Sequence, residues 1–200
     1  MKIRNNKTKI SSEAILSTAV HFFSKKGYKG TSIKDISDKL KVSKPAIYYY
    51  FNNKMEILEI LHSRAFEELL SPYEEVTNCN LPLVEKFKKL IENQVKVVAK
   101  NADLVKIFFG DYKEFPKKIK REIRKKRRRY TENWTQLYEA GIKADVFRDT
   151  DPKISVFTFM GACNWIQMWY SPNGKLNENE LAKLVTDLLA TGYLTHTSLK

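Results

Sequence analysis

Hydroxyl, lysine and tyrosine side chains crowd one short segment near the start of this 200-residue chain. They lie within residues 31–54, where apolar residues at helical spacing predict two short helices joined by a tight turn. Tyrosine and serine hydroxyls and lysine ammonium groups can hydrogen-bond phosphates, and the start of a helix can reach base edges in a major groove. The segment therefore predicts a DNA-binding helix-turn-helix, with a surface helical hairpin in an unrelated bundle as the alternative.

The first helix of this pair is predicted to begin at Thr31 or Ser32, whose hydroxyls can accept a hydrogen bond from a free N–H of the first turn. Ile33, Ile36 and Leu40 recur at spacings of three and four, which gives the helix one apolar stripe. That stripe must face the rest of the domain, so the two helices can pack as one unit.

The second helix follows a turn at residues 40–42. Ser43 is expected to cap it, and Pro45 suits a first turn, where no intrahelical N–H partner is lost. Ile47 and Tyr50 should point back to the core. The side chains left on the outer face are Lys44, Ala46, Tyr48 and Tyr49.

Residues 10–60 resemble, without a gap, the DNA-binding part of the TetR/AcrR family of repressors, above all through Val-Ser-Lys-Pro-Ala-Ile-Tyr-Tyr-Tyr-Phe-Asn-Asn-Lys at 42–54. The resemblance implies that phosphates are held by Thr31, Ser32, Tyr48, Tyr49 and Lys54, and that base edges are faced by Ser43, Lys44, Pro45 and Ala46. Lys41, also included among the expected DNA-binding residues, stands where the family usually has Gly in the turn. A positive φ at Lys41 would cost roughly 1 kcal/mol, which leaves its exact placement open.

Composition limits the function classes further. The chain has a net charge of +13 and 42% hydrophobic residues, with no long uncharged apolar run and no apolar signal core at its start. We therefore expect a cytoplasmic protein without a membrane span, in which Cys79 and Cys163 stay reduced. No metal-ligand spacing, nucleotide loop or nucleophile–base pair occurs, so no metal site, no cofactor and no enzyme activity are expected.

The chain is predicted to be all-α, with about nine helices in a small helix-turn-helix domain at 1–55 and a larger ligand-binding and dimerisation bundle at 56–200. Residues 1–9 are expected to form a loose basic arm that could touch DNA. Outside the pair described above, the expected helices are 11–26, 53–70, one from 82, 102–112, 116–141, 151–170 and 177–193, with a break between Pro72 and Asn80.

The last two helices carry a dimerisation signal. Residues 154–170 are apolar on nearly every side, and Leu184 and Leu188 lie among the apolar residues of the last helix. A helix that is apolar all round must be buried, either in a monomer core or partly against a second copy. The pair resembles the four-helix dimer interface of the TetR family, and a two-fold dimer would suit a palindromic DNA site.

Aromatic residues outside the DNA motif could line an apolar pocket. Residues 164–176 resemble a narrower TetR branch whose members repress fatty-acid and sterol degradation and respond to acyl-CoA thioesters. We therefore expect a repressor released from DNA by an effector, preferably a fatty acyl-CoA, with a planar aromatic or cationic drug as the alternative. The residues expected to bind the effector are Phe108, Tyr112, Arg124, Arg127, Arg128, Tyr130, Trp134, Trp165, Trp169 and Tyr170.

A second basic stretch needs its own explanation. Residues 117–129 contain ten Lys or Arg and one acid, Glu122. This run could bind the phosphates of coenzyme A, form a solvated face, or lie on a membrane surface. A direct role in DNA binding is the weaker expectation from sequence, because the recognition motif lies elsewhere.

Overall fold

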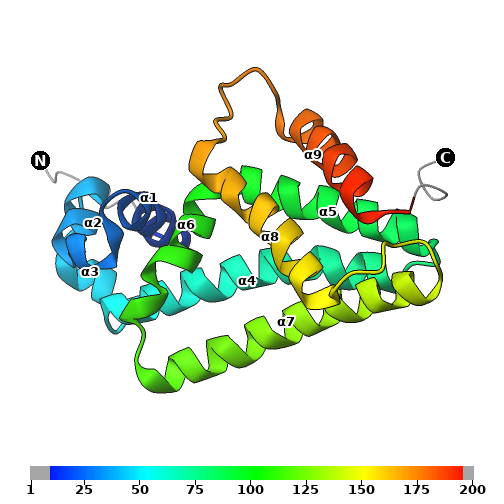
Figure 1. Ribbon diagram of the computed structural model, residues 1–200. Helices are drawn as coiled ribbons and strands as arrows, with labels where there is room; N and C mark the ends of the chain where they lie inside the picture. The colour runs from blue at the N-terminus through cyan, green and yellow to red at the C-terminus, as the bar shows by residue number, and fades with distance from the viewer. Residues whose placement is uncertain (1–9, 196–200) are drawn as a thin grey trace, which may run out of the picture.

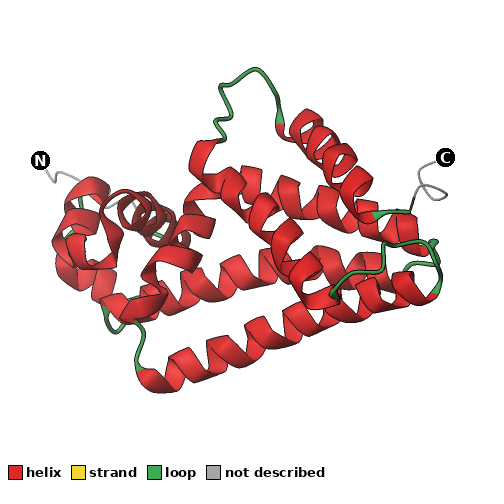
Figure 2. Cartoon of the chain, viewed as in Figure 1, coloured by secondary structure: helices red, strands yellow, loops and turns green. Residues whose placement is uncertain are grey.

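The computed structural model describes residues 10–195 apart from the side chain of Ser71, and the expected arm at 1–9 lies outside the described residues. Between residues 10 and 195 the chain forms nine α-helices and one 3-10 turn, and its only β-type pairing is an isolated bridge between Phe147 and Leu194. Figures 1 and 2 show the arrangement, which confirms the all-α prediction. The elements are α1 (Ser12–Gly30), α2 (Ile33–Leu40), α3 (Lys44–Tyr48), α4 (Lys54–Asn78), α5 (Leu83–Lys100), α6 (Ala102–Gly110), η1 (Asp111–Glu114), α7 (Lys117–Lys143), α8 (Pro152–Trp169) and α9 (Glu178–Tyr193).

Helices α1, α2 and α3 form a small unit, called the head here, at one end of the molecule (Figure 1). The head closes around fully buried apolar side chains, among them Ile15, Ile36 and Ile47, and the first turns of α4 complete its core with Ile57 and Leu58. Burying these side chains is the main term that stabilises so small a unit.

The remaining helices form the body, and α4 connects it to the head (Figure 1). Helix α4 runs through Pro72 without ending, so the predicted break at Pro72 is wrong and the helix ends only at Asn78. Tertiary packing explains the difference: Tyr73 and Val76 are buried in the body core, and the Tyr73 hydroxyl donates to the carbonyl of Asn133 at 2.7 Å. These contacts offset the loss of the intrahelical hydrogen bond that proline cannot donate.

Helix α7 runs along one edge of the body, α5 packs against both α8 and α9, and α8 crosses α7 (Figure 1). The body core contains a cluster of rings in which Phe87, Trp134, Tyr138, Phe147 and Phe159 are each almost fully buried. Within the described part of the chain, no helix is both long and apolar enough to cross a membrane.

Replacing Gly141 with Ala is expected to lower the free energy of unfolding by about 2 kcal/mol, the usual range for overpacking a filled core. A Cβ at this position of α7 would lie 2.1 Å from Cδ2 of Phe147, and that ring is itself enclosed by Phe87 and Tyr138. Urea denaturation followed by circular dichroism measures the change.

Gly110→Ala is the matched control, because a Cβ on Gly110 meets nothing within 4 Å. Gly110 has helical φ and ψ, so alanine there is expected to be neutral or slightly stabilising. Equal stability of both variants would contradict the packing assigned to Phe147.

Candidate nucleic-acid interface and ligand cavity

The turn between α2 and α3 has the geometry of a helix-turn-helix. Ser32 caps α2, accepting from the Asp35 N–H at 3.1 Å, and Asp35 accepts in return from the Ser32 N–H at 2.7 Å. Lys41 ends the helix with φ 55° and ψ 41°, the left-handed conformation that glycine adopts at lower cost. The strained lysine expected from the sequence is therefore present, and the motif accommodates it.

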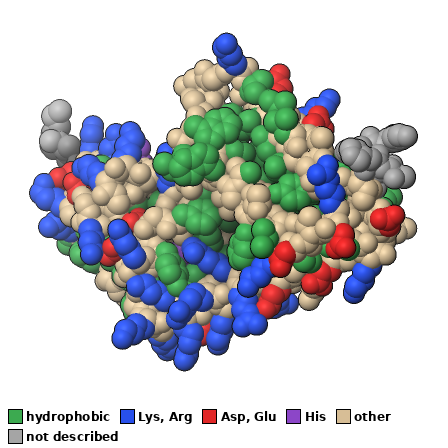
Figure 3. All heavy atoms as spheres, in the orientation of Figure 1, with side chains coloured by type: hydrophobic (Ala, Val, Ile, Leu, Met, Phe, Trp, Pro, Cys, Tyr) green, Lys and Arg blue, Asp and Glu red, His purple; other side chains and the backbone are tan. Residues whose placement is uncertain are grey.

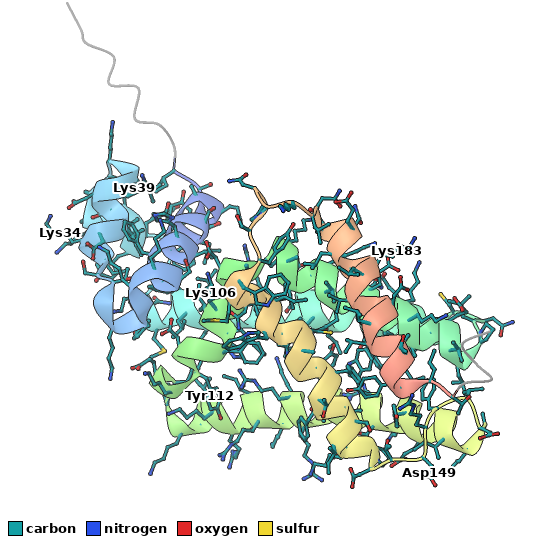
Figure 4. The ribbon with its side chains drawn as sticks, turned by 45° about the horizontal axis from the view of Figure 1, so that its top comes forward. Lys34, Lys39, Lys106, Tyr112, Asp149 and Lys183 are labelled. Carbon is teal, nitrogen blue, oxygen red and sulfur yellow. The ribbon has the colours of Figure 1, made fainter. Side chains whose placement is uncertain are left out.

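Helix α3 presents a largely unpaired outer face. Ser43 precedes the helix, but its hydroxyl makes no capping hydrogen bond, which corrects the capping role expected for it. Lys44 is exposed, Tyr48 has half of its surface exposed and Tyr49 has 83%. Ile47 is completely buried, so the helix is anchored on one side and open on the other. Figure 4 shows Lys34 and Lys39 on α2 at the same end of the molecule.

Thr31 and Lys54 depart from the expectation that their side chains hold phosphates. The Thr31 side chain is buried, and its hydroxyl donates to the Gly27 carbonyl at 3.0 Å. The Lys54 ammonium group donates to the carbonyls of Tyr28 and Thr31 at 2.7 and 2.6 Å, and burial lowers its pKa. Both side chains thus hold the end of α1, and Lys54 joins it to the start of α4.

Between α4, α5, α6, α7 and α8 lies a cavity of about 290 Å³, called the body cavity here. Most of its lining side chains are apolar or aromatic, while Gln94, Arg127, Thr131 and Asn164 contribute polar groups. None of the described residues that line it is acidic. The complete lining is Phe66, Leu69, Gln94, Phe108, Phe109, Arg127, Tyr130, Thr131, Phe157, Met160, Gly161 and Asn164.

Arg127 is the one cation among the lining residues of the body cavity. Its Nη2 donates to the Phe108 carbonyl at 2.8 Å, and its guanidinium lies 4.3 Å from the Phe108 ring centre and 4.8 Å from that of Tyr112. The Nε–H is buried and has no hydrogen-bond partner among the described residues. A buried N–H without a partner is costly, so this group is suited to donate to an oxygen atom of a ligand.

Three other polar side chains that line the body cavity are linked by hydrogen bonds. The Tyr130 hydroxyl donates to Oε1 of Gln94 at 3.0 Å, and Nε2 of Gln94 donates to Oδ1 of Asn164 at 2.9 Å. This arrangement occupies the Asn164 oxygen and leaves its amide N–H groups as donors. The cavity thus combines apolar walls with hydrogen-bond donors and has no acid to receive a cation.

His62 on α4 packs between Phe108 of the body cavity and Phe115, which belongs to the apolar cluster of the head. Its ring stacks on Phe108 with centroids 4.5 Å apart, and its Nε2 lies 3.5 Å from Nη2 of Arg127. Burial, and then the nearby Arg127 charge, lower the pKa of His62 to about 4, so the ring is neutral near pH 7. Neutral His62 can lie beside the guanidinium without charge repulsion.

The segment after α6 joins the body to the head. In η1, the Asp111 carboxylate accepts from the Tyr28 N–H at 3.2 Å, and Glu114 forms an ion pair with Lys29 at 3.4 Å. Asp111 is buried, which raises the pKa of its carboxyl group. Only Gly110 separates η1 from Phe109, so a short piece of chain joins the wall of the body cavity to the contacts that hold the end of α1.

Three of the ten predicted effector residues line the body cavity: Phe108, Arg127 and Tyr130. A fourth, Tyr112, does not line it but contacts the guanidinium of Arg127. The other six do not line it. Arg124 and Arg128 are exposed on the outer side of α7, and Arg128 forms an ion pair with Glu132. Trp134 is buried in the ring cluster of the body core, so packing leaves it no contact with the cavity.

The last three residues of that prediction lie on or beyond the outer side of α8. Trp165 and Trp169 each have more than half of their surface exposed, and Tyr170 lines a separate polar groove between the head and the body. Sequence reasoning also missed Gln94 and Asn164. A buried amide in an otherwise apolar helical stripe, as Gln94 is in α5, is the signal that could have indicated them.

Helices α8 and α9 leave an apolar surface uncovered, visible as the green area in the upper centre of Figure 3. We call it the α8/α9 face. Its exposed large side chains are Ile154, Phe157, Trp165, Met168, Trp169, Leu184 and Leu188. Contiguous apolar patches of this kind on a folded protein mark interaction surfaces.

Comparison with known proteins agrees with this geometry. Residues 15–61 match the model of bacterial regulatory proteins of the tetR family, and residues 80–193 match the tetracyclin repressor-like C-terminal domain. The HTH-type transcriptional repressor KstR2 of Rhodococcus jostii is 22% identical over 181 residues, which cover 89% of this chain and 88% of that protein.

Two solved structures have the same fold. The ketosteroid transcriptional regulator KstR2 of Mycobacterium tuberculosis superposes with a TM-score of 0.87 and 18% identity, covering 94% of this chain and 97% of that one. AibR, solved with isovaleryl coenzyme A and operator DNA, superposes with a TM-score of 0.76 and 22% identity, covering 88% and 96%. The exposed face of α3 and the cavity in the body agree with two family matches, of which the second alone spans more than half of the residues. This chain therefore belongs to the TetR family of bacterial transcriptional regulators.

Proposed function

We propose that this protein is a homodimeric repressor that binds a palindromic operator through the outer face of α3 and leaves it when an acyl group, presented as a coenzyme A thioester, enters the body cavity. The family consists of DNA-binding transcription regulators that respond to ligands, so an enzyme activity is not proposed. The observation that carries the effector class is the lining of the cavity: apolar walls, one arginine with a free Nε–H, and no acid.

For DNA binding, the proposal assigns base contacts to the exposed start of α3. Ser43 and Lys44 lie there, and Pro45 and Ala46 follow in the first turn. Tyr48 and Tyr49 would donate to phosphates, together with the exposed Ser32 at the start of α2. The 83% exposure of Tyr49 supports this role, because it leaves the hydroxyl free to reach a phosphate.

For dimerisation, the proposal pairs the α8/α9 face with its copy in a second subunit. A two-fold axis through this face would bring two heads to one side, as a palindromic site requires. A protein with this role acts where the chromosome is, so the proposal also places it in the cytoplasm.

For the effector, the volume of the body cavity limits how much of the molecule can bind inside it. At roughly 30 Å³ for each water-sized atom, 290 Å³ holds about ten non-hydrogen atoms. That is enough for an acyl group but not for a whole coenzyme A thioester. The acyl part would therefore lie inside, with its carbonyl oxygen at Arg127 or Asn164, and the coenzyme would remain at the mouth.

The absence of an acid separates the two candidate effector classes. A cationic drug would need a carboxylate, and the four candidates from sequence were Asp103, Asp111, Glu114 and Glu139. None of the four lines the body cavity, and Asp111 and Glu114 are bonded to α1. The cavity therefore favours an oxygen-bearing apolar effector over a cation.

The decisive experiment measures release from DNA. A palindromic duplex is first selected from random DNA with the protein, and fluorescence anisotropy then follows its release by acyl-CoA thioesters of graded chain length, by the matching free acids and by a cationic dye. We expect release by thioesters with short or medium acyl groups and none by the dye. Release by the dye alone would contradict the effector assignment, and failure to select any duplex would contradict the repressor function itself.

A further inference from the structure

The basic start of α7, residues 117–121, lies beside the head although it is far from the recognition helix in sequence. Helix α7 begins just after η1, and Asp111 and Glu114 of η1 hold the end of α1. Ile119 and Ile123 of α7 pack into the same apolar core as α1 and α4. The start of α7 is therefore fixed against the head rather than against the far end of the body (Figure 1).

This start carries uncompensated positive charge. Lys117 and Lys118 are exposed and form no ion pair with any described residue, and Lys120 uses its ammonium group on the carbonyl of Lys113. Glu122 is the single acid of residues 117–129, and it is shared between Arg121 and Lys125. Figure 3 shows Lys and Arg side chains gathered along the lower edge of the molecule and on the head.

The positions of these cations oppose the stability of the helix. The first turn of α7 contains no acidic residue, and lysines at a helix start face the positive end of the helix dipole. Lys117 and Arg121, and Arg121 and Lys125, are like-charged pairs four residues apart, which destabilise a helix. Packing alone gives no reason for this arrangement, whereas an anionic partner would offset it.

We propose that Lys117 and Lys118 contact phosphates of the DNA that flanks the operator. This inference rests on the proposed DNA binding and extends it, because the base contacts of α3 and the phosphate contacts of Ser32 belong to the head alone. Neutralising additional phosphates releases additional counterions, so the affinity of the protein would rise with DNA length beyond the palindrome.

The residues around these lysines favour DNA over a membrane surface. A helix that lies on a membrane inserts an apolar face beside its cations. Here Ile119 is half-buried and Ile123 buried within the protein core, so the outward residues of this stretch are polar and charged. The stretch also lies at the end of the molecule that carries the recognition helix.

The test compares two duplexes built on the selected palindrome, one trimmed to the palindrome and one with about ten extra base pairs on each side. Wild type is expected to bind the long duplex about tenfold more tightly. The double variant Lys117→Glu/Lys118→Glu should bind the short duplex nearly as wild type does and lose the gain on the long one. Its salt slope on the long duplex should fall by about two for each subunit.

Lys89→Glu/Lys143→Glu is the matched control, with the same change in net charge on exposed residues of the body. It should keep the gain on the long duplex. Equal affinity of wild type for both duplexes would overturn the inference. So would a Lys117→Glu/Lys118→Glu variant that keeps the gain on the long duplex but loses a binding to anionic lipid vesicles that wild type shows. Neither result would affect binding to the short duplex, on which the proposed function is judged separately.

Discussion

If the protein forms the proposed dimer, replacing Leu188 with Asp is expected to give a monomer and to lower the affinity for a palindromic operator by about 100-fold or more. Leu188 lies on the α8/α9 face with 67% of its surface exposed, so the substitution removes little contact within the subunit. In a two-fold interface the new carboxylate would be buried once in each subunit, and an unpaired buried charge is strongly unfavourable. A monomer presents one recognition helix and loses half of the specific contacts.

Analytical ultracentrifugation measures the oligomeric state, and anisotropy with the selected duplex measures the affinity. Lys183→Asp is the control, because Lys183, labelled in Figure 4, lines a groove between α9 and α5 and is not among the exposed apolar residues of the α8/α9 face. The control should remain dimeric and bind DNA. A Leu188→Asp protein that stays dimeric would show that the subunits meet through another surface, whereas a monomer with full operator affinity would remove the need for a dimer.

The helix-turn-helix could be predicted from sequence because its determinants are local. The capping pair Ser32 and Asp35, the stripe through Ile36 and the proline at the start of α3 each act within a few residues. Even the strained conformation of Lys41 follows from its place in a short turn. The partners of Lys54 are carbonyls at the distant end of α1, and no local pattern specifies these contacts.

The body cavity could be predicted only in part, because periodicity shows which residues face inward but not what they meet. Tyr130 and Trp134 lie four residues apart on the inner side of α7. Tyr130 nevertheless lines the body cavity, whereas Trp134 packs within the ring cluster against Phe159. Helix α8 is apolar on several sides, so its sequence did not reveal that Phe159 is buried while Trp165 is exposed. These differences depend on how five helices meet.

In the proposed release mechanism, the body cavity is connected to the head through a few contacts that a ligand could change. Arg127 holds the last turn of α6 through the Phe108 carbonyl, and the segment that follows holds α1 through Asp111. An effector oxygen that accepts from the unpartnered Nε–H would draw the guanidinium toward the ligand and away from that carbonyl, which accepts from Nη2. A ligand shifts a conformational equilibrium only by its difference in affinity for the two states, and a displacement of this guanidinium is where such a difference can arise.

Replacing Arg127 with Met is expected to weaken acyl-CoA binding by about 100-fold while leaving the affinity for DNA nearly unchanged. Methionine keeps an apolar stem against Phe108 and Tyr112 but removes the one cation found among the described residues that line the body cavity. Hydrogen bonds from a charged donor contribute about 1.5–3 kcal/mol, and the upper value corresponds to a factor of roughly 150. Isothermal titration calorimetry measures binding, and the anisotropy assay measures release from the duplex.

Two controls separate loss of the ligand contact from loss of structure. Arg124→Met removes an arginine one turn earlier on the exposed side of α7 and should leave binding and release unchanged. The Phe108 carbonyl loses a donor in Arg127→Met, so thermal unfolding of the variant must be measured as well. If Arg127→Met still folds and is released by the same thioester concentration as wild type, the effector does not contact Arg127. If it folds but is already released without effector, Arg127 holds α6 in the DNA-binding state and its contact with Phe108 is the more important one.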